Sequence, residues 1–94
     1  MADTPSQALI DLIRASGPAH HHAYLQTNGD DPEWPLWYAD YLYSDLQRLL
    51  ERTFTKSDLV YWLVRVDKEF RAQSPKVDWP TYYAMQFTEH LGKD

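Results

Sequence analysis

The sequence contains no cysteine. Disulfide bonds, thiolate nucleophiles and cysteine-ligated zinc or iron–sulfur sites are therefore excluded. No apolar stretch approaches the roughly 20 residues that are needed to cross a bilayer. The first residues, Met1 to Pro5, also lack the basic and apolar regions of a signal peptide. From these absences we expect a cytoplasmic protein with no membrane partner.

Basic residues are scarce, with 9 Lys and Arg against 14 Asp and Glu and a net charge of −5. Binding to nucleic acid needs a basic surface, so no nucleic-acid partner is expected. The imbalance lies in residues 1–47, which hold seven acids and one base, whereas residues 48–94 hold seven acids and eight bases. The two halves either attract one another within the fold or make the chain complementary to a second copy.

The 94 residues are 44% apolar and 15% aromatic, and they include four Trp and seven Tyr. This composition predicts one globular domain that spans residues 1–94. Large aromatic side chains serve a small domain in two ways, as core residues and as recognition surface. Their number alone does not separate the two roles.

A short motif occurs twice, as EWPLWYA at residues 33–39 and as DWPTYYA at residues 78–84. We call it the Trp-Pro motif. Proline is tolerated in the first turn of a helix, and an acid just before it can cap the free N–H groups there. The residue before a proline is biased towards extended backbone, which lets its ring cover the beginning of the helix. We therefore expect two helices that begin at these motifs, with Trp34 and Trp79 largely buried.

Capping signals and apolar spacing predict an all-α bundle of four to five helices. We expect the longest helix and the helix that follows it to form an antiparallel pair at the centre of the bundle. A β-strand is the competing interpretation of the apolar run from Leu59 to Val66. The expected helices run from the Thr4-Pro5 cap to a stop at Gly17-Pro18, from Pro18 to Gln26 before Asn28-Gly29, from Pro35 to Arg52, from the Thr55–Asp58 cap through Phe70, and through Tyr83 and Phe87 to Leu91 with Gly92 as the stop.

Three consecutive histidines, His20 to His22, precede an acidic turn. Neighbouring helical residues point about 100° apart, so a helix cannot aim all three imidazoles at one metal ion. We expect no metal site and no cofactor. His20 and Tyr24 do share a helical face, and a carboxylate from the turn could join them for acid–base chemistry. Because no nucleophile, phosphate-loop or oxyanion motif accompanies them, a non-enzymatic role is favoured.

The first Trp-Pro motif and the residues just after it carry more aromatic rings than one helix face can bury, namely Trp34, Trp37, Tyr38, Tyr41 and Tyr43. We therefore predict a small interaction or assembly module that forms a homodimer through an aromatic-rich helical surface. The alternative is a small-molecule-binding or catalytic protein with a His/Asp/Tyr/Trp pocket. The expected ligand- or partner-binding residues are His21, Tyr24, Asp31, Trp34, Trp37, Tyr38 and Tyr41.

Overall fold

The computed structural model describes residues 6–24 and 31–92, which contain four α-helices. These are α1 (Gln7–Ala23), α2 (Trp34–Leu50), α3 (Lys56–Gln73) and α4 (Trp79–Leu91). The all-α prediction is confirmed, and the apolar run from Leu59 to Val66 lies inside α3 rather than in a strand. Among the described residues, no helix is both long enough and apolar enough to span a membrane.

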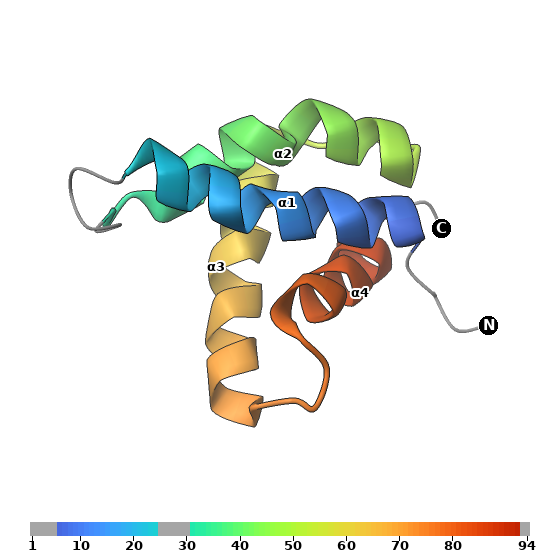
Figure 1. Ribbon diagram of the computed structural model, residues 1–94. Coiled ribbons are helices and arrows are strands. Elements are labelled where there is room, and N and C mark those ends of the chain that lie inside the picture. The colour runs from blue at the N-terminus through green and yellow to red at the C-terminus, as the bar shows by residue number, and fades with distance from the viewer. Residues whose placement is uncertain (1–5, 25–30, 93–94) are drawn as a thin grey trace.

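Helix α1 extends across the molecule between α2 and α4, and α3 runs away from α2 at a steep angle (Figure 1). The predicted antiparallel pair is therefore wrong in its geometry, although residues of α2 and α3 do share the core. The loop from α3 turns back so that α4 begins beside α1 (Figure 1). The beginning of α4 therefore lies close to the middle of α1, although the two helices stand at opposite ends of the sequence.

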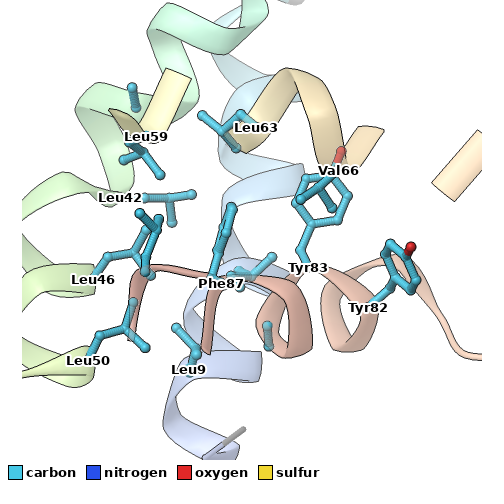
Figure 2. Packing of buried hydrophobic residues seen from close by; sticks show 14 residues of the cluster. Leu9, Leu42, Leu46, Leu50, Leu59, Leu63, Val66, Tyr82, Tyr83 and Phe87 are labelled. Carbon is cyan, nitrogen blue, oxygen red and sulfur yellow. The ribbon is translucent and has the colours of Figure 1, made fainter. Parts of the chain in front are cut away.

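The core is centred on Phe87 of α4, which is completely buried. Figure 2 shows leucines of α2 and α3 pointing towards it, with Tyr83 one turn away on its own helix. The other large and fully buried apolar side chains come from α1, α2 and α3 and are Leu9, Ile13, Leu42, Leu46, Leu59, Leu63 and Val66. All four helices thus contribute to one hydrophobic cluster.

Helix α1 continues through Gly17-Pro18, where the sequence predicted a stop and a second helix. Its cap is Ser6, whose hydroxyl accepts a hydrogen bond from the Leu9 N–H at 3.1 Å. The reason for the glycine is tertiary: a Cβ built at Gly17 would lie 2.9 Å from Cζ2 of Trp79. Gly17 therefore admits the Trp79 ring instead of ending the helix. The predicted cap at Thr4-Pro5 and the stop at Asn28-Gly29 lie outside the described residues.

The two Trp-Pro motifs do begin helices, but their acids differ in role. Asp78 caps α4 by accepting a hydrogen bond from the Thr81 N–H at 3.3 Å. Glu33 makes no such side-chain bond at the start of α2, where the prediction of an acidic cap is wrong. At this helix start the side chain that bonds the backbone is that of Asp31, whose Oδ1 accepts a hydrogen bond from the Glu33 N–H at 3.1 Å. The predicted cap of α3 is confirmed, since Thr55 and Asp58 form a reciprocal capping box.

This difference predicts unequal effects of two matched substitutions. Asp78→Ala should lower the melting temperature by a few degrees, because it removes a cap and a pairing partner of Arg14. Glu33→Ala should leave the melting temperature nearly unchanged, since no capping bond is lost. Thermal melts followed by circular dichroism at neutral pH measure both. Equal effects of the two changes would contradict the assignment of the caps.

The Asp78 contribution should also depend on pH. Hydrogen bonds from Thr81 and then from Arg14 lower the pKa of Asp78 below its ordinary value of 3.8 in the folded protein. A carboxyl group with a lowered folded-state pKa stabilises the fold above the unfolded pKa, and this stabilisation is lost as pH falls through the folded pKa. The difference in melting temperature between the parent and Asp78→Ala should therefore persist at neutral pH and shrink below about pH 4.

Candidate functional site

A pocket of about 420 Å³ opens where the beginnings of α2 and α4 face the middle of α1 and the second half of α3. Volumes of this size are typical of sites for small organic molecules. The side chains that line it come from all four helices, except that of Asp31, which lies just before α2. The lining residues are Ile13, Ser16, His20, Asp31, Trp34, Tyr38, Leu42, Leu63, Asp67, Phe70, Arg71, Trp79 and Tyr83.

Both Trp-Pro motifs contribute the same two residues to this pocket, a Trp and the Tyr four positions later. Trp34 and Tyr38 contact edge to face, with ring centroids 5.9 Å apart and planes at 81°. Trp79 and Tyr83 repeat this arrangement, at 5.8 Å and 88°. The repeated sequence thus produces two similar right-angled aromatic corners. Both tryptophans are partly buried and pack against the hydrophobic core, so most of each ring is covered while one part lines the pocket.

One polar pair lies on the side of the first corner. His20 Nε2 lies 3.2 Å from Oδ2 of Asp31, and the two side chains are only 14% and 7% exposed. The imidazole is surrounded by three rings whose centroids lie 4.9 to 5.0 Å away, those of Tyr24, Trp37 and Tyr38. A buried imidazole held by a carboxylate is a group that can bind a polar ligand or move a proton.

A second polar group lies on the side of the other corner. The Asp67 carboxylate accepts a hydrogen bond from the Tyr83 hydroxyl at 3.4 Å and pairs with Arg71 at 3.2 Å. Burial raises the pKa of Tyr83 above its ordinary value of 10.0, and the Asp67 carboxylate raises that pKa further. Burial likewise raises the pKa of Tyr38. Both phenols therefore remain neutral at physiological pH and keep a proton to donate.

The structure brings together three of the residues expected at a site, because Asp31, Trp34 and Tyr38 all line the pocket. Tyr24 and Trp37 lie behind the lining, in contact with the His20 ring.

The other two expected residues lie elsewhere. His21 is exposed and does not line the pocket, because the next residue of a helix points about 100° away from His20. Tyr41 is partly exposed and stacks on Trp37, with ring centroids 5.1 Å apart. His20 therefore lines the pocket in place of the expected His21, and it lies four residues before Tyr24 on the same helical face.

Five lining residues that bear on ligand recognition were missed: His20, Asp67, Arg71, Trp79 and Tyr83. Trp79 and Tyr83 could have been found from the repeated motif itself, had both copies been assigned to one site. Asp67 and Arg71 gave no such signal, because charges at four-residue spacing on a helix are usually a solvated pair. In the described part of the chain, no cluster of three or more His, Asp or Glu residues is arranged to hold a metal ion.

Comparison of the chain with protein-family models, with curated proteins and with solved structures finds no match. The functional argument therefore depends on the geometry of the pocket. The pocket lining combines the two aromatic corners with two carboxylates beside them, those of Asp31 and Asp67.

Proposed function

We propose that the protein binds a small organic molecule in the pocket between the two Trp-Pro motifs. The observation that carries this proposal is that Trp34 and Trp79, 45 positions apart in the sequence, line the same pocket of about 420 Å³. A Trp that only covered the beginning of its own helix would not need to line the same pocket as the Trp of the other motif. Partly buried aromatic walls with a few polar groups are the usual composition of a ligand site.

The polar groups support a binding role further. His20, Asp31 and Asp67 are held by hydrogen bonds and share the lining with five Trp, Tyr and Phe side chains. Polar groups held in place in this way orient a ligand at small cost, because their side chains are already ordered before binding. The Asp31 side chain is almost completely buried, and its two oxygens are held by the His20 ring and by the Glu33 N–H.

Nuclear magnetic resonance offers a direct test with an internal control. A fragment library titrated into the ¹⁵N-labelled protein should shift the indole N–H signals of Trp34 and Trp79, which line the pocket. The indole of Trp62 should not shift, because Trp62 stacks on His90 outside the lining, with ring centroids 4.1 Å apart. Fragments that shift Trp62 as strongly as Trp34 and Trp79, or a library with no pocket-specific fragment, would contradict the proposal.

A homodimer is the second candidate function, and one observation favours it. Leu36 is 54% exposed and Tyr41 is 38% exposed, and both lie on α2 near Trp37. Sedimentation analysis of the parent and of Tyr41→Ser tests it. A dimer that dissociates on this substitution would support assembly through α2, and a monomeric parent would exclude it.

A further inference from the structure

We propose that the ligand of this pocket carries an alkylated ammonium group, as in a small quaternary amine. This inference rests on the proposed function and adds to it the chemical class of the ligand. Two features carry it, the arrangement of the aromatic rings and the charge of the lining, and Arg71 supplies a test of the sign of the ligand charge.

The aromatic rings form the first part of the argument. Two Trp–Tyr corners lie in one pocket, so four rings line a single space, and the two ring planes of each corner are close to perpendicular. The face of an aromatic ring carries negative charge density, and it attracts a cation whose centre lies within about 6 Å of the ring centroid. Trp is the strongest of the aromatic residues in this respect. Several rings around one space are the arrangement that binds an ammonium group whose hydrogen-bond donors are replaced by methyl groups.

The charge of the lining forms the second part. The ionisable groups that line the pocket, apart from the two tyrosines, are His20, Asp31, Asp67 and Arg71. When histidine is counted as neutral, two carboxylates and one guanidinium give this lining a net charge of −1. Asp31 is almost completely buried, so its charge is weakly screened by solvent. An anionic ligand would be repelled by both carboxylates, whereas a cation gains from them and from the rings.

An inorganic cation fits this site less well than an organic one. Calcium and magnesium ions require about six oxygen ligands, and the lining offers only two carboxylates, one beside each aromatic corner. A cation with methyl groups needs no such ligand set, and its apolar surface gains free energy from leaving water for the aromatic walls.

Arg71 works against a cation, and it therefore supplies a test of the sign of the ligand charge. Its side chain is 76% exposed and pairs with Asp67. Removing this guanidinium should leave Asp67 held by the Tyr83 hydroxyl alone and make the pocket more negative. A cationic ligand should then bind more tightly, and an anionic ligand should bind less tightly. The direction of the change thus identifies the sign of the ligand charge.

Isothermal titration with two probes of similar shape tests the inference. Choline carries a trimethylammonium group, and 3,3-dimethyl-1-butanol is its neutral counterpart with a tert-butyl group. Choline should bind about tenfold more tightly than the alcohol, because only choline gains from the ring faces and the carboxylates. Equal or tighter binding of the alcohol would overturn the ammonium inference and leave a neutral binding pocket. Failure of choline to bind would overturn it also, and the fragment titration would then still test the proposed function separately.

Three variants sharpen this test. Asp31→Asn should weaken choline binding several-fold and leave the binding of the alcohol unchanged, while Arg71→Gln should strengthen choline binding. Asp45→Asn is the matched control, because Asp45 pairs with Arg48 outside the pocket lining. If Asp31→Asn unfolds, Asp67→Asn supplies the same charge change beside the second aromatic corner. Weaker choline binding in Arg71→Gln, or unchanged binding in both Asp variants, would overturn the inference.

Discussion

Replacing Phe87 with alanine is expected to lower the free energy of unfolding by about 3–5 kcal/mol. The side chain is completely buried, and its ring contacts Tyr83 edge to face, with centroids 5.9 Å apart. The substitution removes the transfer free energy of the ring and leaves a cavity among the leucines of α2 and α3 (Figure 2). Small domains possess only about 5–15 kcal/mol in total, so the loss should be a large share of the stability.

Urea denaturation followed by circular dichroism measures this loss. Met85→Ala is the matched control, because Met85 lies on the exposed face of the same helix. The control should change the free energy of unfolding by no more than about 0.5 kcal/mol. A Phe87→Ala protein as stable as the Met85→Ala protein would show that α4 does not pack in the way described.

The second large effect is expected where Trp79 lies against Gly17. Gly17→Ala should destabilise the parent, because the new Cβ would lie 2.9 Å from Cζ2 of the Trp79 ring and force it to move. In a Trp79→Ala background the same change should be stabilising, by up to about 1 kcal/mol, since alanine is the better helix residue. The sign of the Gly17→Ala effect should therefore reverse between the two backgrounds.

A double-mutant cycle measured by urea denaturation isolates this coupling, which should be on the order of 1–2 kcal/mol. The cycle is sensitive to the contact itself, because the helix-propensity gain of alanine is common to both backgrounds and cancels. An effect of the same sign and size in both backgrounds would show that the Trp79 ring does not lie over Gly17. Trp79→Ala alone should cost less than the loss of a fully buried Trp, since the ring is only partly buried.

Local signals predicted most of the helices correctly. The Thr55–Asp58 capping box, the start of α4 at Asp78 and the end near Gly92 all depend on residues within one turn of the chain. The error at Gly17-Pro18 has a different origin. A glycine followed by proline usually ends a helix, and only the packed position of Trp79 shows that the glycine is required for close approach.

The same difference between local signals and tertiary packing explains which residues of the pocket could be predicted. Asp31, Trp34 and Tyr38 are near neighbours in the sequence, and their proximity predicted a shared location. The opposite wall depends on how α4 docks against α1 and α3, which no local pattern encodes. Trp79 was therefore left out of the expected site, whereas it lines the pocket.

The pocket has lining residues from Ile13 of α1 to Tyr83 of α4, so it exists only when all four helices are assembled. If a ligand binds there as proposed, its binding is thermodynamically linked to folding. A ligand present at 100 times its dissociation constant would raise the free energy of unfolding by about 2.7 kcal/mol. For a chain of this size, such a gain would markedly reduce the fraction of molecules that are open to proteolysis. The amount of this protein in a cell would then follow the concentration of its ligand.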